Sequence, residues 1–200
     1  MDDKNTFIPP ANFNRVQTTL VRGGRPKRNN IPFLKFLGID TMVALTERSL
    51  FDGDGENGDA LREYIRENGV RYVHFPVDTS VRDKGKNREI PITHGQVMEI
   101  LEIILNKEYG NVYIYCYNGG QITSLVVACL RKLQLWSTVS IFDEFIHYGS
   151  NVTHNDRTFV QDFVPQLELS RGKLVEWIWS GLNENIIVRH PGFKNVRFIG

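Results

Sequence analysis

Three short apolar runs, rich in β-branched residues, constrain the fold of this chain most strongly. The runs cover residues 39–45, 70–75 and 112–116, and each lies next to a segment with helical spacing. β-Branched and apolar residues favour strands, whereas apolar residues spaced three and four apart favour amphipathic helices. The alternation therefore predicts an α/β fold whose strands lie between helices.

Local signals mark where two of the helices begin and end. Residues 59–67 have helical spacing and stop at Asn68-Gly69, a typical helix end. Thr93-x-x-Gln96 is a capping box, which predicts a helix running toward Leu105. The acidic, glycine-rich residues 52–58 are expected to form a surface loop, since their carboxylates do not follow the register of a calcium-binding loop.

The second half of the chain is mostly helical in pattern. Helical spacing covers residues 123–134, 137–148 and 156–164. Thr153-x-x-Asp156 is a capping box for the last of these. In the tail, residues 186–188 favour a short strand, and Trp177 and Trp179 suit an interface with another chain or the core of the protein itself. The pattern thus predicts a sheet followed by a helical half.

Composition excludes several classes of protein. The 24 Lys and Arg residues balance 23 Asp and Glu residues, and a net charge of +1 argues against a role in binding nucleic acid or an anionic membrane. The longest unbroken apolar stretch, residues 125–130, is far shorter than the roughly 20 residues of a membrane span, and the N-terminus is unlike a signal peptide. We therefore expect a cytoplasmic protein. Two cysteines, Cys116 and Cys129, give neither a disulfide framework nor zinc-ligand spacing, so we expect no metal and no cofactor.

The stretch from Val112 to Ser124 is the most informative about function. It consists of an apolar strand, a glycine-containing loop and the start of a helix. Successive backbone amides in such a loop form an anion-binding nest, and the positive end of the following helix faces the same point, so phosphate is the natural ligand. Cys116, at the end of the strand, would be a thiolate nucleophile stabilised by these amides. It also suits an inert core position, because cysteine is small and packs well.

The sequence around this loop resembles the cysteine-dependent phosphatases with a Cys-x5-Arg loop, and more closely the atypical dual-specificity phosphatases of plants and fungi. The matching segments are residues 7–13, 20–22, 128–136 and 140–145. Within that group the chain is similar to the fungal oxidant-induced cell-cycle-arrest proteins, a set of phosphatase-like paralogues. The resemblance implies an α/β cysteine-phosphatase fold of the dual-specificity type, with a central, mostly parallel sheet flanked by helices and a helical C-terminal half. It implies a phosphatase-like domain over residues 7–166 and an extension over 167–200 that packs on the domain or on a partner.

The loop departs from the family pattern at the positions that are normally basic. Active relatives have His-Cys at the start of the loop and Arg-Thr-Gly at its end, whereas this chain has Tyr115 and Ile122 at the His and Arg positions. The loop positions of the site are Tyr117, Asn118, Gly119, Gly120, Gln121 and Ile122. The family arginine grips two phosphoryl oxygens, and an aliphatic side chain offers neither charge nor donor. Losing one oxyanion donor costs roughly 10²–10³ in rate, so we expect chemistry to be very slow or absent. Cys116 and Thr123, the hydroxyl that in the family helps to stabilise the leaving thiolate, are retained.

A cysteine phosphatase also needs a general acid on a loop opposite its nucleophile. Residues 77–89 occupy the corresponding place, and Asp78, Asp83 and Glu89 are the candidates. The alternating charges of this segment are equally typical of a solvated loop with no catalytic role. The segment also contains four basic residues, which could supply positive charge near the otherwise neutral anion-binding loop after Cys116. They are Arg82, Lys84, Lys86 and Arg88. Arg22 matches a family arginine of the scaffold, and we expect it to be structural.

Three hypotheses about function follow. The first is a pseudophosphatase that acts as a subunit or regulator together with paralogous phosphatases, in inositol pyrophosphate or in oxidative-stress and cell-cycle signalling. The second is a weakly active phosphatase on inositol pyrophosphates or phosphotyrosine, and the third is a sensor of a phosphorylated metabolite. The expected partners are paralogous phosphatase-like proteins in a hetero-oligomer and a phosphorylated small molecule, with neither nucleic acid nor membrane.

Overall fold

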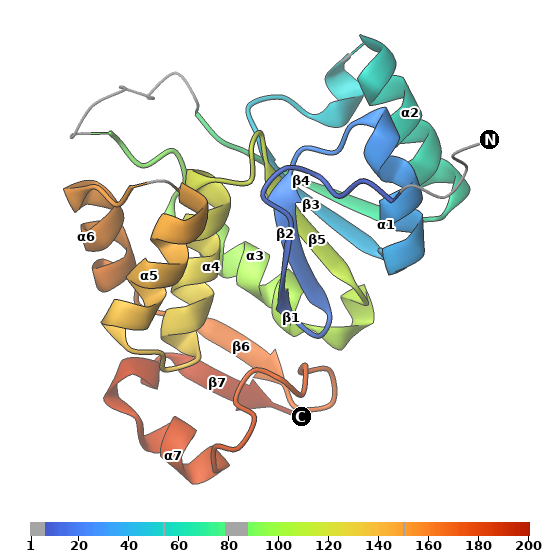
Figure 1. Cartoon of the computed structure of the whole chain (residues 1–200). Helices are drawn as coiled ribbons and strands as arrows, with labels where there is room; N and C mark the ends of the chain where they lie inside the picture. Colours follow the sequence, from blue (N-terminus) through green and yellow to red (C-terminus); the bar gives the residue numbers. More distant parts are fainter. Residues whose placement is uncertain (1–6, 54, 79–87, 150) are drawn as a thin grey trace. The chain divides into compact units, whose positions relative to one another are not determined.

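The computed structural model describes residues 7–53, 55–78, 88–149 and 151–200. The chain divides into two compact units (Figure 1). The first comprises Met1–Val77 and Gly110–Thr123, and the second comprises Asp78–Tyr109 and Ser124–Gly200. Each unit is described by itself.

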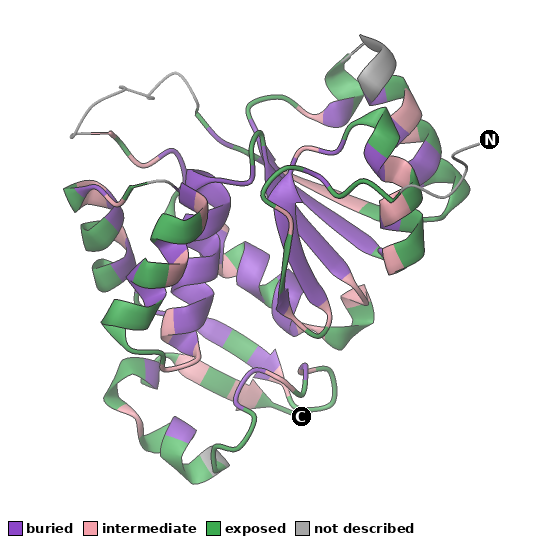
Figure 2. Ribbon diagram, viewed as in Figure 1, coloured by how far each residue is buried: buried purple, intermediate pink, exposed green. Residues whose placement is uncertain are grey.

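The first unit is built on a five-stranded sheet with the order β1-β2-β5-β3-β4. The strands are β1 (Asn14–Gln17), β2 (Leu20–Gly24), β3 (Thr41–Thr46), β4 (Arg71–Pro76) and β5 (Val112–Cys116). Only β1 runs antiparallel to its neighbour, so the sheet is mostly parallel, as expected. The three strands predicted from apolar runs are confirmed as β3, β4 and β5. Strand β5 pairs with β2 on one side and β3 on the other, and is buried along its length (Figure 2).

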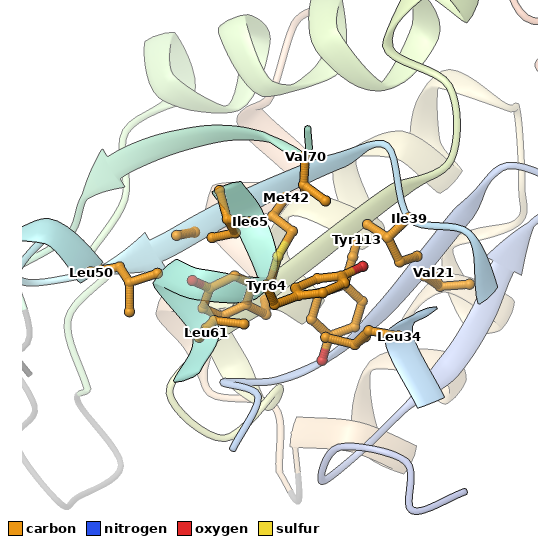
Figure 3. Close-up of a cluster of buried hydrophobic side chains, with 12 residues drawn as sticks. Val21, Leu34, Ile39, Met42, Leu50, Leu61, Tyr64, Ile65, Val70 and Tyr113 are labelled. Carbon is orange, nitrogen blue, oxygen red and sulfur yellow. The ribbon is translucent and has the colours of Figure 1, made fainter. Parts of the chain in front are cut away.

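Two helices cover one face of this sheet, namely α1 (Ile31–Leu37) and α2 (Gly55–Glu67), and two short 3₁₀ turns lie at Arg28–Asn30 and Leu50–Asp52. Leu34 of α1 and Leu61 and Tyr64 of α2 pack against Met42 and Tyr113 of the sheet (Figure 3). The surface loop expected at residues 52–58 is wrong in part, because the α2 backbone already begins at Gly55. Packing of the apolar helix face outweighs the low helix propensity of glycine in that first turn.

The second unit contains most of the helices. They are α3 (His94–Leu105), α4 (Gln121–Leu133), which starts in the first unit, α5 (Thr138–Gly149), α6 (His154–Asp162) and α7 (Glu184–Arg189). Short 3₁₀ turns lie at Lys107–Tyr109 and Pro191–Phe193. Both capping boxes are confirmed: Thr93 caps α3 and Thr153 caps α6, each with the expected reciprocal bonds. None of the helices in the described ranges is long and apolar enough to cross a membrane.

The tail adds a second sheet, which the sequence pattern did not indicate. Strands β6 (Leu167–Ser170) and β7 (Val196–Ile199) pair in parallel. The strand expected at 186–188 is wrong: these residues lie in α7, where the Asn183 side chain caps the helix by accepting a bond from the Asn185 amide. Trp179 is buried within this unit, and its Nε1 donates to the Leu133 carbonyl at 2.8 Å.

Candidate functional site

The site is the turn that joins β5 to α4. Cys116 is the last residue of β5, residues 117–120 form the turn, and Gln121 opens the helix. The Cys116 thiol is free and fully buried. Because side chains alternate along a strand, Cys116 and Tyr115 lie on opposite faces of the sheet. The predicted strand, glycine-containing loop and helix are therefore present in the expected order.

The scaffold binds the outer side of this turn through three successive carbonyls. The Arg25 amide donates to the Tyr117 carbonyl at 3.2 Å, and the Asn12 side-chain amide donates to the Asn118 carbonyl at 2.9 Å. Buried Arg22 donates through Nη2 to the Gly119 carbonyl at 2.9 Å. In a trans peptide the carbonyl and the next amide point in opposite directions, so these bonds turn the following amides toward the inside of the loop. Arg22 is thus a structural residue, as expected.

Gly119 makes the close approach between the loop and β2 possible. Its φ is +70°, in the left-handed region that glycine tolerates best. A Cβ atom at this position would lie 2.6 Å from the Gly24 nitrogen and 2.7 Å from the Gly23 oxygen. The backbone of the loop therefore rests directly on the backbone of the neighbouring strand.

The inner side of the loop is covered by one of its own side chains. The Oδ1 atom of Asn118 accepts a bond from the Gly120 amide at 3.0 Å and one from the Cys116 thiol at 3.8 Å. A phosphoryl group bound beside the nucleophile would accept a bond from the same Gly120 amide and would place its phosphorus next to the Cys116 sulfur. The Asn118 carboxamide thus lies where the sequence predicts an anion.

The substituted positions of the loop are buried in apolar surroundings. Ile122, at the family arginine position, is 1% exposed. Tyr115, at the histidine position, lies in the core of the first unit and stacks on Tyr113 with ring centroids 5.6 Å apart. Burial, the proximity of Tyr72 and a hydrogen bond with Tyr72 raise the pKa of Tyr115 well above its usual value. Neither residue replaces the missing charge.

Thr123 is the other retained element. It is fully buried, and its hydroxyl oxygen has no hydrogen-bond partner among the residues that the structure describes. Buried hydroxyls are usually satisfied, so this unused one beside the loop is unusual.

Two of the three acid candidates lie in the described part of the chain. Asp78 and Glu89 are exposed and lie in the second unit, and Asp83 lies outside the described residues. The choice among the three stays a prediction. Of the four cations proposed to compensate the nest, Arg82, Lys84 and Lys86 also lie outside the described residues. Arg88 is engaged elsewhere, since its Nη2 forms a 2.5 Å ion pair with the fully buried carboxylate of Asp156.

Two residues of the site were not singled out by sequence reasoning, namely Asn118 as an internal ligand of the loop and Asn12 as its support. Asn12 has a φ of +51°, a conformation in which asparagine is over-represented. The pattern of the sequence carries no other signal for either role. Within the described part of the chain, no group of three or more His, Cys, Asp or Glu side chains is placed to hold a metal ion.

A mostly parallel sheet whose inner strand ends in a buried cysteine, followed by an amide-lined loop and a helix, defines the class of cysteine-dependent phosphatases. Residues 7–181 match the model of the tyrosine phosphatase family Y_phosphatase2, and the chain belongs to that family. The match confirms the resemblance drawn from the sequence.

Relatives of known sequence and structure agree with this assignment. The chain is 32% identical over 171 residues to OCA6 of Saccharomyces cerevisiae, a protein provisionally named a tyrosine-protein phosphatase, with 82% of this chain and 74% of OCA6 covered. It is 32% identical over 144 residues to the inositol diphosphatase DSP1 of Oryza sativa subsp. japonica, with 72% and 60% covered. The core catalytic domain of the PP-IP phosphatase SIW14 from S. cerevisiae has a similar fold, with a TM-score of 0.66 at 24% identity over 79% of this chain and 88% of that one. The P. aeruginosa TpbA fold is also similar, with a TM-score of 0.53 at 20% identity over 76% and 83%. The cysteine-phosphatase fold is confirmed.

Proposed function

We propose that this chain is a catalytically impaired member of its phosphatase family, which acts as a subunit or regulator alongside related phosphatases in inositol pyrophosphate signalling. The observation that carries the proposal is the state of the loop around Cys116. No residue from 117 to 122 has a charged side chain. The Oδ1 atom of Asn118 already accepts hydrogen bonds from the Cys116 thiol and the Gly120 amide.

Turnover at a cysteine nucleophile needs a group that holds the phosphoryl oxygens as charge moves onto them. Bidentate bonds from arginine are well suited to this task, because they combine charge with fixed geometry. Ile122 supplies neither. Removal of a single oxyanion donor lowers the rate by roughly 10²–10³, and the loss of a charged pair of donors should lower it at least as far. An anion must also displace Asn118 before it reaches Cys116.

The substrate class is suggested by the relatives. DSP1 is named an inositol diphosphatase, and SIW14 is named a PP-IP phosphatase. A chain that keeps the fold and the loop backbone but lacks the charge is suited to binding beside such enzymes, or to binding their ligands, without hydrolysis. The partners remain a proposal, for which paralogous phosphatase-like proteins are the first candidates.

The test is phosphate release by the purified protein from an inositol pyrophosphate and from a phosphotyrosine peptide, with Cys116→Ser as the matched control. We expect the two proteins to release phosphate at the same background rate. Release that depends on Cys116 at a rate typical of an active relative would overturn the proposal. A double variant, Ile122→Arg with Tyr115→His, should gain at least tenfold if it folds, which melting temperature checks.

A weakly active phosphatase is the second candidate, and the buried, unsatisfied hydroxyl of Thr123 favours it. In that case the double variant changes little, because the native chain is already competent. Thr123→Val then lowers the residual Cys116-dependent rate, whereas in an impaired protein Thr123→Val leaves the background rate as it is.

A further inference from the structure

A cavity of about 650 Å³ lies within the second unit, and none of its lining residues belongs to the loop of residues 116–122. It is lined by the end of α4, the start of α5, the end of α6 and residues 190–195. The volume falls within the range of natural ligand pockets. Nothing in the proposed chemistry at Cys116 uses this cavity.

The inner surface of the cavity is mostly apolar. The buried side chains of Ile141, Phe142, Phe163 and Phe193 line it. At its rim two large apolar side chains remain open to solvent, since Trp136 is 41% exposed and Val164 is 53% exposed. The apolar surface therefore continues from the cavity onto the outside of the unit, which is typical of an interaction surface.

Trp136 is held in its exposed position by a rigid arrangement. The guanidinium of buried Arg131 lies 4.1 Å from the centroid of the Trp136 ring. That guanidinium donates two bonds to the Glu144 carboxylate, at 2.7 and 2.9 Å, and a third to Gln134 at 2.9 Å. A fixed aromatic side chain loses little entropy when a partner binds, and tryptophan is enriched among residues that dominate interface energies.

The residue before Trp136 is in an unfavourable backbone conformation. Leu135, which also lines the cavity, has a φ of +62° at the end of α4. Glycine is usual at this position of a helix end, and a left-handed leucine is uncommon. The Trp136 amide still closes the turn by donating to the Arg131 carbonyl at 3.0 Å. The chain thus keeps a strained leucine where glycine would be easier, and both Leu135 and Trp136 face the cavity.

The charges around the cavity have one sign. Its charged lining residues are Lys132 and Lys194, and none of its described lining residues is acidic. His190 also lines it, and its Nδ1 accepts a bond from the Gly192 amide at 3.1 Å. The Lys132 ammonium donates to the carbonyls of Val160, Gln161 and Phe163, so it is occupied in joining α4 to α6. Lys194 is exposed at the rim and forms no ion pair among the described residues. An apolar ligand that carries a carboxylate would complement this surface.

We propose that the cavity is a docking site for a segment of a partner protein that presents an apolar side chain next to an acidic one. The apolar side chain enters the cavity against Phe142 and Phe163 and packs beside Trp136, while its neighbouring carboxylate pairs with Lys194. A second copy of this chain using the same face is disfavoured, because it would bring Lys194 against a like charge. The proposal does not depend on the loss of catalysis at Cys116.

The test uses the full chain as the target for selection from a random 12-residue peptide library, followed by fluorescence anisotropy with the selected peptides. We expect the peptides to share a large apolar residue beside Asp or Glu. Trp136→Ala and Val164→Asp should each weaken their binding at least tenfold. Val188→Ala is the matched control, since Val188 is exposed on α7 in the same unit but does not line the cavity.

A charge exchange tests the role of Lys194. Lys194→Glu should weaken the acidic peptide three- to tenfold, and a peptide with Lys in place of the acidic residue should recover that loss on the variant. Melting temperatures within 2 °C of the parent would show that the variants fold. Peptides that bind Trp136→Ala and Val164→Asp as well as the parent would overturn the proposal. The proposal would also be overturned if the selected peptides shared a basic residue instead of an acidic one, or if the chain formed a homodimer that Val164→Asp abolishes. Binding of only uncharged small molecules or lipid vesicles would overturn it as well.

Discussion

Replacing Gly119 by alanine should destabilise the first unit more than the same change at Gly69. Both glycines have nearly the same backbone conformation, with φ of +70° and +62°. They differ in what surrounds them. A Cβ at Gly119 would press on the backbone of β2, whereas a Cβ at Gly69 would meet nothing within 4 Å. The pair therefore separates backbone strain from the contact between loop and strand.

The expected magnitudes follow from these two differences. An L-residue in the left-handed region costs about 1–2 kcal/mol, and this is the whole effect expected for Gly69→Ala. Overpacking adds about 1–3 kcal/mol at Gly119, because Gly23 and Gly24 belong to a strand paired with β5 and cannot retreat easily. Gly119→Ala should thus lower the free energy of unfolding by about 2–5 kcal/mol. The corresponding fall in melting temperature is about 2–4 °C for each kcal/mol in a chain of this size.

The assay is urea unfolding followed by two probes. All three tryptophans, Trp136, Trp177 and Trp179, lie in the second unit, so tryptophan fluorescence reports on that unit. Far-UV circular dichroism reports on both units. Equal losses of stability for Gly119→Ala and Gly69→Ala would refute the argument that the loop is held against β2. The amides around Cys116 would then not be positioned by the scaffold.

Three further predictions concern the cores of the two units. Burial and the charge of Asp40 raise the pKa of Tyr64 to about 12, and burial raises those of Tyr113 and Tyr115 well above their usual range. Above pH 10 these phenols stay neutral in the folded state, whereas the same phenols ionise in the unfolded chain. The free energy of unfolding should therefore fall with rising pH, by about 1.4 kcal/mol per pH unit for each tyrosine. Urea titrations from pH 9 to 12 will measure this slope. Asp156→Ala should lower the free energy of unfolding by about 3–5 kcal/mol in urea, since it removes the buried carboxylate that pairs with the partly buried Arg88 and accepts two bonds from Thr153. A loss below 1 kcal/mol would contradict this. Trp179→Phe should lower the free energy of unfolding by about 1–3 kcal/mol in the same assay, because the Leu133 carbonyl loses its hydrogen-bond donor. An unchanged unfolding midpoint would show that this bond contributes nothing to stability.

The parts of the fold that sequence could predict are those in which local signals and burial agree. The runs that became β3 and β5 are apolar and buried along their length, and burial requires that composition. The run that became β4 is recognisable from its own apolar residues, although this edge strand is only partly buried. The capping boxes at Thr93 and Thr153 depend only on residues three apart, so they can be recognised without knowledge of the fold.

The failures lie where the composition of a segment does not decide its structure. Residues 186–188 have the composition of a strand, yet the Asn183 cap starts a helix there. Strands β6 and β7 are four residues each and pair across 25 intervening residues, so neither is recognisable from its own composition. The role of Asn118 depends on the fold of a turn, because its side chain reaches Cys116 and Gly120 only when the loop closes.

The absence of charge in the loop and the position of the Asn118 side chain are connected through the hydrogen-bonding needs of the buried loop amides. A buried amide without a partner costs about 1–3 kcal/mol, and a bound anion would satisfy such an amide. Ile122 removes the charge that attracts an anion, so the Gly120 amide needs another acceptor, and Asn118 provides one without a net charge. Restoring arginine at position 122 alone therefore leaves a competitor in place. Adding Asn118→Ala to the variant Ile122→Arg with Tyr115→His should increase phosphate release further, while Asn118→Ala in the native background should leave it at the Cys116→Ser level.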